Sequence, residues 1–274
     1  MPFFSVVISL YNKENYIENT LKSVLNQTFD DYEIIIVNDG STDKSEEIVL
    51  KFDDQRIKYF SKTNEGVSVA RNFGIGKARS NYIAFLDADD LWKPNHLSTL
   101  MHLIQDYPDA GIYASRYQLI FKNQSVYVPH FKNVDSDYSG VVADYFESSL
   151  HYSIATASSV AVSKTIFKNV GLFDTSISAG EDTDMWIRIA LKHPVVISKS
   201  ITAAYVHFTE NSLSKTTILQ KKIKAFSFYK EDELRNKSLK KYLDLYRIEY
   251  ALHYKMSDKL PIAKELYNEI NPEN

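Results

Sequence analysis

Short, mostly apolar runs alternate with amphipathic segments over the first third of the chain. These runs occupy residues 4–10, 34–37, 57–60 and 82–86. Their content of Val, Ile, Phe and Tyr is typical of strands, and the unbroken runs at 34–37 and 82–86 are typical of buried strands. The segments between them predict helices at residues 16–26, 44–52 and 66–77. Strands and helices that alternate in this way predict a parallel sheet with right-handed crossover connections.

The pattern changes after Pro94. From here the spacing of apolar residues predicts helices at 96–105, 165–170 and 181–192, and strands at 111–121, 125–128, 159–163, 195–198 and 202–206. Residues 129–158 show no period and predict an irregular, mobile segment, and the chain beyond Lys215 predicts helices only. We therefore expect an α/β domain at 1–214, with halves at about 1–93 and 94–214, and a C-terminal helical region at 215–274.

Composition limits the functions that the chain can have. It has 274 residues, of which 44% are hydrophobic and 24% are charged, and it contains no Cys. Without Cys the chain can form neither a disulfide, nor a thiol nucleophile, nor a Cys-ligated zinc site, which fits a reducing compartment. Residues 215–274 carry 13 Lys and Arg against 9 Asp and Glu, whereas the rest of the chain carries 19 against 26. An acidic body of this kind argues against nucleic-acid binding.

Three carboxylates, Asp87, Asp89 and Asp90, directly follow the apolar run at 82–86. If the backbone stays extended, the side chains of Asp87 and Asp89 leave it on the same side. The sequence indicates no basic partner for them, so their mutual repulsion favours a bound cation, and hard oxygen ligands favour Mg²⁺ or Mn²⁺. A polar turn that caps the next helix is the alternative.

Other polar residues also follow predicted strands. Tyr11 comes after the first strand and Asp39 ends the second. In parallel sheets of this type, ligands bind beyond the carboxyl ends of the strands. We therefore expect Tyr11, Asp39 and Asp87 to converge on one binding site. A second acidic group begins the helix predicted at 181–192, where the helix dipole stabilises negative charge.

Taken together, these segments resemble the family 2 glycosyltransferases with the GT-A fold. Six motifs carry the resemblance, in the family's order and over about residues 4–214: Val6-Val7-Ile8-Ser9-Leu10-Tyr11-Asn12, Val37-Asn38-Asp39-Gly40-Ser41-Thr42-Asp43, Gly66 with Ala70-Arg71-Asn72, Phe85-Leu86-Asp87-Ala88-Asp89-Asp90, Gly180-Glu181-Asp182-Thr183-Asp184-Met185-Trp186, and His207 with Asn211-Ser212-Leu213-Ser214. The resemblance implies a Rossmann-like, mostly parallel central sheet flanked by helices, with the C-terminal helices as an appendage. It also implies an inverting enzyme that moves a sugar from a nucleotide-sugar donor, by default a UDP-sugar, to an acceptor hydroxyl.

The resemblance assigns residues to the donor site. It implies that Tyr11 lies against the nucleotide base, that Ser9 and Leu10 make backbone contacts, and that Asp39 bonds to the base or the ribose. It extends the nucleotide-sugar-binding site to Gly66, Arg71, Asp87 and Ala88. Within this set, Arg71 is expected to reach the base or the phosphates.

The cofactor that the resemblance implies is Mn²⁺ or Mg²⁺. It makes Asp89 the principal metal ligand and gives Asp87 contacts to both the metal and the ribose. His207 matches a position that contacts the metal or the pyrophosphate in some relatives. Many relatives have Arg where this chain has Tyr205, so a phosphate contact from that position is not expected here.

The resemblance makes Asp182 the general base that takes the proton of the acceptor hydroxyl. Glu181 and Asp184 are the alternatives for this role, and a group that only caps its helix is a third reading. Glu181 and Trp186 are also assigned to the acceptor side, with packing in the core as the alternative for Trp186. The segment at 129–158 is expected on the acceptor side as well.

The expected acceptor is a glycan or a lipid-linked saccharide in cell-surface polysaccharide, capsule or lipopolysaccharide biosynthesis, and the expected activity is that of a hexosyl- or N-acetylhexosaminyltransferase.

Residues 215–274 combine Lys with Phe and Tyr, which predicts peripheral contact with the inner face of the membrane, packing on the core, or contact with a second subunit in a homodimer. No basic leader precedes the first strand, and no apolar run approaches the roughly 18 residues of a membrane span. We therefore expect a cytoplasmic protein.

Two other functions compete with sugar transfer. A metal-dependent phosphoryl or nucleotidyl transferase can also use paired Asp residues, but the sequence has no Gly-rich phosphate loop of the kind such enzymes use. A non-catalytic nucleotide-sugar-binding protein would keep the donor site, but it has no need of a general base such as Asp182.

Overall fold

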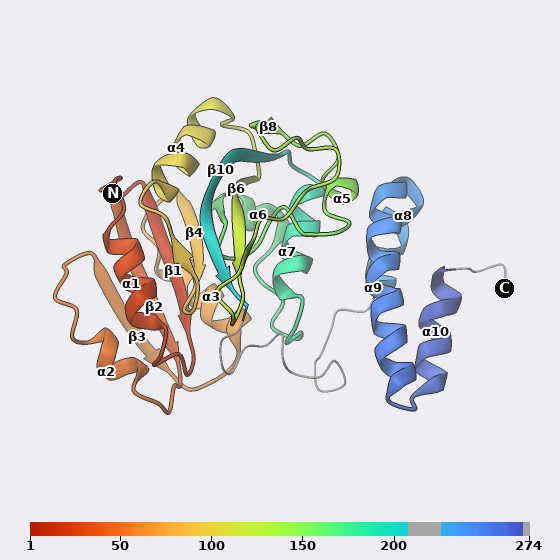
Figure 1. Cartoon of the computed structure of the whole chain (residues 1–274), viewed down its shortest axis with the longest axis horizontal. Coiled ribbons are helices and arrows are strands. Elements are labelled where there is room, and N and C mark those ends of the chain that lie inside the picture. Colours follow the sequence, from red (N-terminus) through yellow and green to blue (C-terminus); the bar gives the residue numbers. More distant parts are fainter. Residues whose placement is uncertain (208–225, 271–274) are drawn as a thin grey trace.

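The computed structural model describes residues 1–207 and 226–270. At its centre is a ten-stranded sheet whose main path has the strand order β3-β2-β1-β4-β9-β6-β10-β5. Two short strands pair at its margin, β7 with β6 and β8 with β10. Figure 1 shows the sheet with helices around it and the C-terminal helices standing beside it as a separate group.

The first half of the sheet is parallel, as predicted. It consists of β1 (Phe4–Leu10), β2 (Tyr32–Asp39), β3 (Ile57–Lys62) and β4 (Tyr82–Asp87). The connecting helices are α1 (Ile17–Leu25), α2 (Ser45–Val49) and α3 (Val67–Lys77). Every residue of β2 is buried and β1 is buried almost throughout, as expected for strands that are covered on both faces.

The approach of α3 to the sheet depends on one glycine. A Cβ atom at Gly74 would lie 2.4 Å from Cγ1 of Val7 in β1, so only a residue without a side chain lets the helix come this close. Arg71 precedes Gly74 by less than one turn. The close packing therefore fixes the position of Arg71 near the carboxyl ends of the strands.

The second half of the sheet is mixed. The strand β9 (Val160–Ser163) pairs antiparallel with both β4 and β6 (Ile112–Ile120) and so joins the two halves. Beyond β6, β10 (Val195–Val206) is parallel to it, and β5 (Leu91–Trp92) is antiparallel to β10. The prediction of two strands at 195–198 and 202–206 is wrong, because β10 is one strand whose pairing is irregular between Ser198 and Ala203.

The remaining elements of this half are β7 (Val126–Tyr127), β8 (Gly140–Val141), α4 (His96–Asp106), α5 (Tyr145–Ser148), α6 (Ile166–Val170) and α7 (Glu181–Ala190). The prediction that 129–158 is wholly irregular is wrong, because it contains β8 and α5. Buried Phe131, Phe146 and Ile154 attach this segment to the core.

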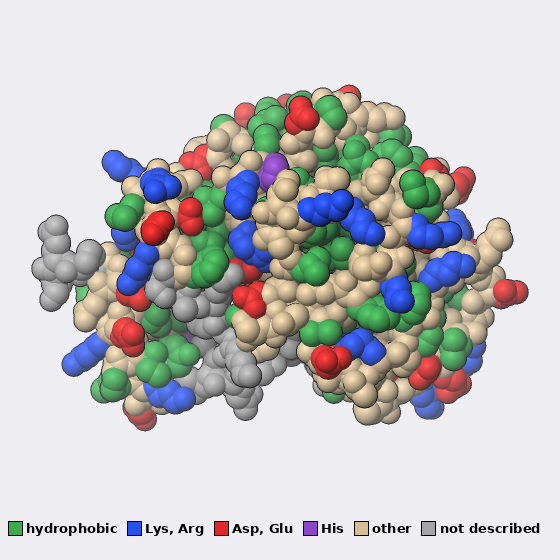
Figure 2. Space-filling view, turned by 180° about the vertical axis from the view of Figure 1, so that it is seen from behind, with side chains coloured by type: hydrophobic (Ala, Val, Ile, Leu, Met, Phe, Trp, Pro, Cys, Tyr) green, Lys and Arg blue, Asp and Glu red, His purple; other side chains and the backbone are tan. Residues whose placement is uncertain are grey.

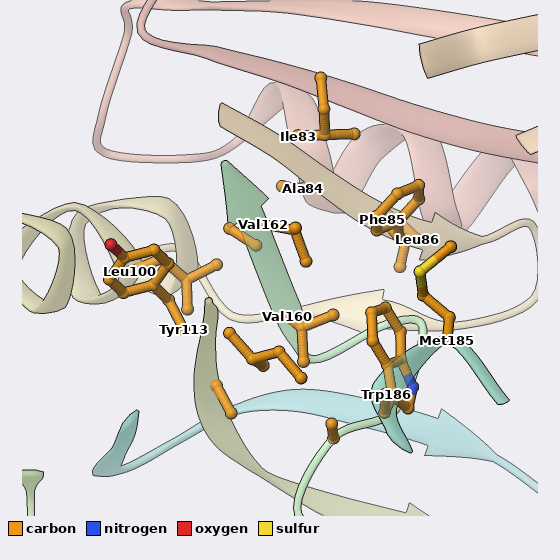
Figure 3. Packing of buried hydrophobic residues seen from close by; sticks show 14 of the residues in the cluster. Ile83, Ala84, Phe85, Leu86, Leu100, Tyr113, Val160, Val162, Met185 and Trp186 are labelled. Carbon is orange, nitrogen blue, oxygen red and sulfur yellow. The ribbon is translucent and has the colours of Figure 1, made fainter. Parts of the chain in front are cut away.

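Part of the hydrophobic core lies where the two halves of the sheet meet. Figure 3 shows Phe85 of β4 and Val160 of β9 packed with Met185 and Trp186 of α7. The rings of Phe85 and Trp186 have centroids 6.3 Å apart. The start of α7 is thereby held close to the end of β4.

The described part of the C-terminal region is helical, as predicted. It contains a 3-10 turn (Phe226–Tyr229), α8 (Lys230–Arg235), α9 (Lys237–Met256) and α10 (Leu260–Ile270). Arg247 of α9 is buried and pairs with Glu233 of α8, Asp244 of α9 and Glu269 of α10. These ion pairs join the three helices into one unit. Among the described residues, no helix combines the length and apolar character that a membrane crossing requires.

Candidate active site

Two loops at the carboxyl ends of β1 and β2 hold each other in place. The backbone N–H of Asn12 donates to Oγ of Ser41 over 3.0 Å, and Oδ1 of Asn12 accepts from the N–H of Thr42 over 2.8 Å. The N–H of Lys13 donates to Oγ of Ser45 over 2.8 Å. Asn12 has a φ of 49°, which Asn tolerates better than most residues. The two loops therefore form one fixed rim beside the sheet.

The residues predicted to contact the nucleotide base begin on this rim. Ser9 pairs in register with Asp87 across β1 and β4. Leu10 is buried, so only its backbone can make the contact predicted for it. Tyr11 follows with 43% of its surface exposed, which leaves its ring open to a ligand. These placements are compatible with the predicted contacts, which stay predictions.

Asp39 ends β2, and its carboxylate fastens the start of α3. Its Oδ1 accepts from the N–H of Glu65 over 3.0 Å, and its Oδ2 accepts from the N–H of Gly66 over 2.7 Å. The ammonium of Lys62 lies 2.7 Å from Oδ1. Gly66 has a φ of 97°, a region that glycine adopts without strain. Because a carboxylate has about four lone pairs to offer, Asp39 keeps capacity for one further bond to a base or a ribose.

One buried arginine joins the end of β4 to the start of α7. Nη2 of Arg71 lies 2.8 Å from Oδ1 of Asp87, and Nη1 lies 2.8 Å from Oε1 of Glu181. The guanidinium also lies over the ring of Phe173, 5.4 Å from its centroid. Burial lowers the pKa of Arg71, but the surrounding carboxylates raise it by more, so it lies above its ordinary value. Arg71 is thus a fixed positive charge between two acidic segments.

Asp89 is paired with a lysine from a distant part of the chain. Nζ of Lys13 lies 2.6 Å from Oδ2 of Asp89, and both side chains are largely buried. The expectation that Asp87 and Asp89 lack basic partners is wrong, because α3 and the loop after β1 bring Arg71 and Lys13 to them. Nor does the backbone stay extended, since the N–H of Asp90 donates to the carbonyl of Asp87 over 3.0 Å and closes a turn.

The turn after β4 rests on contacts that the sequence did not indicate. The carbonyl of Ala88 accepts from Oγ1 of Thr20 over 3.0 Å. Asp90 is buried, and its carboxyl group accepts from Oγ of Ser158 and from the N–H of Val206. Burial and the charges of the neighbouring aspartates raise the pKa of Asp90 well above its usual range. Asp90 therefore supports the turn that presents the other two aspartates.

Metal binding was predicted for Asp87, Asp89 and His207. Within residues 1–207 and 226–270, no three His, Asp or Glu side chains form a group that could hold a metal ion. The ring of His207 lies beside those of Phe121 and Tyr205, with centroids 5.4 and 6.0 Å away. The side chain of Asp87 is 32% exposed, and Mg²⁺ is typically held by one or two carboxylates together with phosphate and water. The two aspartates fit such an ion, but His207 does not join them in a three-ligand group.

Asp182 lies at the start of α7, beside Glu181. It is partly exposed, and its Oδ1 accepts from the N–H of Thr183 over 2.7 Å. Burial and the carboxylate of Glu181 raise the pKa of Asp182 to about 6, and Arg71 opposes this rise. Asp182 is therefore still ionised at neutral pH, but it is a stronger base than an ordinary aspartate. A general base is most effective when its pKa lies near the working pH.

The two alternatives to Asp182 as the base are engaged elsewhere. Glu181 is buried against Arg71. Asp184 is buried, and its Oδ1 accepts from the hydroxyl of Tyr229 over 2.5 Å. These contacts favour Asp182 for a role that needs access to a substrate.

Trp186 lies in the core. It is 1% exposed, and its ring packs against those of Phe85 and Phe173. The core alternative is therefore favoured over the acceptor-side role that was also considered for Trp186.

Two features around the site were not predicted from the sequence. The first is Lys13, which no local signal connects with Asp89. The second is the set of Tyr242, Tyr246 and Tyr250 of α9, in a region for which only helices were predicted. Their four-residue spacing places them on one helix face, and this signal was available in the sequence. The charge of Asp182 adds to the effect of burial in raising the pKa of each of these tyrosines.

The parallel half-sheet, the mixed half that follows it and the acidic turn after β4 define the class of GT-A-fold glycosyltransferases. The chain belongs to glycosyl transferase family 2, whose model matches residues 5–163. The match includes the ends of β1, β2 and β4 with Asp39, Arg71, Asp87 and Asp89. It stops before α7 and β10, so the assignments of Asp182 and His207 do not rest on it.

Relatives and solved structures agree with this membership. An uncharacterised glycosyltransferase of Rickettsia typhi is 33% identical over 208 residues, which cover 73% of this chain and 64% of the relative. The glycosyltransferase GlyA of Streptococcus pneumoniae is 37% identical over 139 residues, which cover 50% of this chain and 20% of GlyA. The crystal structure of S. aureus TarS 1–349 in complex with UDP-GlcNAc has a TM-score of 0.68 at 17% identity, covering 97% of this chain and 91% of the TarS chain. The match with TarS supports the fold, and the chain spans less than two thirds of the Rickettsia relative.

Proposed function

We propose that the chain is an inverting, metal-dependent glycosyltransferase that moves a hexose or an N-acetylhexosamine from a UDP-sugar to a hydroxyl of a glycan or lipid-linked saccharide. Membership of glycosyl transferase family 2 supports sugar transfer over phosphoryl transfer and over nucleotide-sugar sensing. The TarS structure of the same fold contains UDP-GlcNAc, which supports a uridine nucleotide as the donor.

The observation that carries the proposal is the buried bridge from Asp87 through Arg71 to Glu181, at 2.8 Å on each side. It connects the acidic turn after β4, where a donor diphosphate would bind, to the helix start that carries Asp182. The bridge therefore holds the proposed leaving-group region and the proposed base in a fixed arrangement, as group transfer between two substrates requires.

The chemistry requires one base and positive charge at the leaving group. The acceptor oxygen forms a bond to the anomeric carbon while the bond from that carbon to the phosphate oxygen of the donor breaks. Asp182 takes the proton of the acceptor hydroxyl. Lys13 and Arg71 lie at the ends of β1 and β4, where their charges would stabilise the departing diphosphate. A single displacement of this kind inverts the anomeric configuration.

Asp89 and Asp87 are the residues that would hold Mn²⁺ or Mg²⁺. When bound, the ion supplies further positive charge to the diphosphate. The pair of Lys13 with Asp89 and that of Arg71 with Asp87 keep both carboxylates at the end of β4. His207 remains a proposed contact to the metal or the pyrophosphate.

We place this activity in cell-surface polysaccharide or lipopolysaccharide synthesis, with the protein in the cytoplasm at the inner face of the membrane. The exposed side chains of Leu245, Ile248 and Leu252 on α9 support a peripheral membrane contact through residues 215–274. A homodimer contact through the same surface is the alternative. We also propose that 1–214 forms the catalytic domain and 215–274 a separate helical region. The motif at Asn211-Ser212-Leu213-Ser214 lies outside the described residues.

The direct test is release of UDP from a panel of UDP-glucose, UDP-galactose and UDP-GlcNAc, with Mn²⁺ or with EDTA. We expect release from at least one of these donors in Mn²⁺ and its loss in EDTA. Equal affinity for UDP in both conditions, measured by isothermal titration, would contradict the metal dependence. Cleavage of none of the nucleotide sugars, with or without saccharide acceptors, would contradict the proposed transfer.

A further inference from the structure

The C-terminal helices contact the part of the fold that carries Asp182. The hydroxyl of Tyr229 donates to Asp184 of α7, one turn at most from Asp182. On the same side, the ring of Tyr242 in α9 packs against that of Phe146 in α5, with centroids 5.8 Å apart. The core-packing alternative for this region is therefore observed, and Figure 1 shows α9 as the C-terminal helix nearest to α5.

Ion pairs and hydrogen bonds strengthen this contact. Oγ of Ser238 donates to Oδ2 of Asp144 over 2.5 Å. Nζ of Lys241 lies 3.0 Å from Oε1 of Glu147. Arg247, on the next turns of α9, holds α8 and α10 to it. The first turns of α9 are thus fixed to α5 at Ser238, Lys241 and Tyr242.

Five tyrosines surround the Asp182 side of this contact, and we call them the tyrosine wall. They are Tyr117 of β6, Tyr145 of α5, and Tyr242, Tyr246 and Tyr250 of α9. Burial raises the pKa of every member, and the charge of Asp182 raises each of them further. All five therefore feel the charge of Asp182 and keep their hydroxyl protons at neutral pH.

Hydrogen bonds order the tyrosine wall. The hydroxyls of Tyr242 and Tyr246 are 3.2 Å apart, and Tyr246 also hydrogen-bonds with Thr183, the residue after Asp182. The hydroxyl of Tyr117 donates to the carbonyl of Ser153 over 2.9 Å. The residue next to the base candidate is thus in contact with α9 through the side chains of Thr183 and Tyr246.

Exposure divides the wall into a supporting part and an accessible part. Tyr117, Tyr145 and Tyr242 are buried, whereas Tyr246 and Tyr250 are partly exposed. The accessible rings lie one turn apart on α9, so they offer two adjacent aromatic surfaces beside a carboxylate that is itself partly exposed. Figure 2 shows that acidic and basic side chains mix with hydrophobic patches on the face that it views.

We propose that Tyr246 and Tyr250 bind the sugar ring of the acceptor, so that α9 completes the active site begun by the sheet. This inference rests on the proposed function. Tyrosine combines a large, rigid apolar face with a polar hydroxyl at low cost in conformational entropy. The flat ring covers the apolar C–H face of a saccharide, and the hydroxyl bonds to its rim. The negative charges of Asp182 and Glu249, which act on both tyrosines, favour a neutral saccharide over a phosphate group.

The test uses the full chain on an array of immobilised bacterial surface saccharides, with Tyr246→Ala, Tyr246→Phe and Tyr250→Ala. The control is Tyr267→Ala, which removes an exposed tyrosine of α10. We expect the wild type and the control to bind the same saccharides. Tyr246→Ala and Tyr250→Ala should lower binding by about tenfold or more, and Tyr246→Phe, which keeps the ring, by about threefold at most. Thermal unfolding checks each variant, and if Tyr246→Ala does not fold, the other two variants give the answer.

Release of UDP from UDP-sugars in the absence of an acceptor is measured on the same proteins. Tyrosine-dependent binding of a saccharide supports the inference, whether or not the donor is cleaved. An array without signal for the wild type, or equal binding by all variants, would overturn it. Normal UDP release beside such a result would leave the proposed function intact, while saccharide binding without any donor cleavage would count against the proposed function alone.

Discussion

The two sides of the candidate active site carry different kinds of side chain. On the side of β1, β2 and β4, charged residues meet in tight pairs, such as Lys13 with Asp89 and Arg71 with Asp87. On the side of β6, α5 and α9, the residues around Asp182 are tyrosines with neutral hydroxyls. Dense charge suits a diphosphate and a metal ion, whereas aromatic rings suit the apolar face of a saccharide. The difference in chemistry therefore supports the proposed division of the site into a donor side and an acceptor side.

Arg71 is where the two sides meet, and removing it should have the largest effect. Arg71→Met leaves two acidic groups, Asp87 and Glu181, without their shared partner, and breaking a buried ion pair in this way costs about 3–5 kcal/mol. Urea unfolding should show this loss in the free energy of unfolding. The matched control is Lys51→Met, which breaks the exposed pair with Glu47 and should cost less than about 1 kcal/mol. Equal losses in the two variants would contradict a structural role for the bridge.

The raised pKa of Asp182 predicts how the rate of transfer depends on pH. Because its pKa is raised to about 6 and only the ionised form can accept a proton, kcat/KM for transfer should fall by about tenfold per pH unit below this value and level off above it. Steady-state kinetics between about pH 4.5 and 8 measures this profile. The affinity for UDP, measured over the same range, should not follow it. A kcat/KM that is constant down to the lowest pH would contradict the role of Asp182.

The smallest expected effect is on the pH dependence of stability, and it comes from a buried histidine beside the second half of the sheet. Burial lowers the pKa of His96 from 6.5 to about 3, and its Nδ1 lies 2.8 Å from Oγ1 of Thr202. The unfolded chain binds a proton below pH 6.5 and the folded chain does not, so stability is lost as the pH falls. Between about pH 7.5 and 5.5 the free energy of unfolding should drop by about 1.4 kcal/mol from this group.

Urea unfolding of the wild type and of His96→Gln at both pH values isolates this contribution, because the variant lacks the titrating ring. The variant should show the smaller drop. The same drop in both proteins would mean that His96 does not set the pH dependence of this half.

The strand ends on the proposed donor side were predictable from the sequence, and the surroundings of Asp182 on the proposed acceptor side were not. Asp39 and Asp87 end buried strands, and local apolar patterns predict where such strands end. Because the carboxyl ends of parallel strands lie at one edge of the sheet, both residues could be placed at that edge. The partners of the aspartates were missed because Lys13 meets Asp89 across 76 positions, and no local pattern encodes that contact. The tyrosine wall combines β6, α5 and α9, and only packing of the C-terminal helices on α5 brings these together.

Errors in the predicted elements have the same origin. The segment at 129–158 shows no apolar periodicity, so the sequence alone did not predict its short helix α5. Contacts with α9 stabilise this helix, namely those of Phe146 with Tyr242 and of Glu147 with Lys241. The polar Lys199-Ser200 pair suggested a break in β10, but pairing with β6 on either side keeps the strand continuous. In both cases tertiary contacts, and not the local sequence, determine the secondary structure.

The central claim is that Asp182 acts on the acceptor while the aspartates at the end of β4 act on the donor, and the transfer rate of Asp182→Asn at saturating donor tests it most directly. This variant keeps the size of the side chain but loses its basicity, so kcat should fall by about 100-fold or more while the affinity for UDP with Mn²⁺ stays at the wild-type value. Asp89→Asn, assayed beside it, should instead weaken the metal-dependent binding of UDP. Transfer by Asp182→Asn at close to the wild-type rate would contradict the claim.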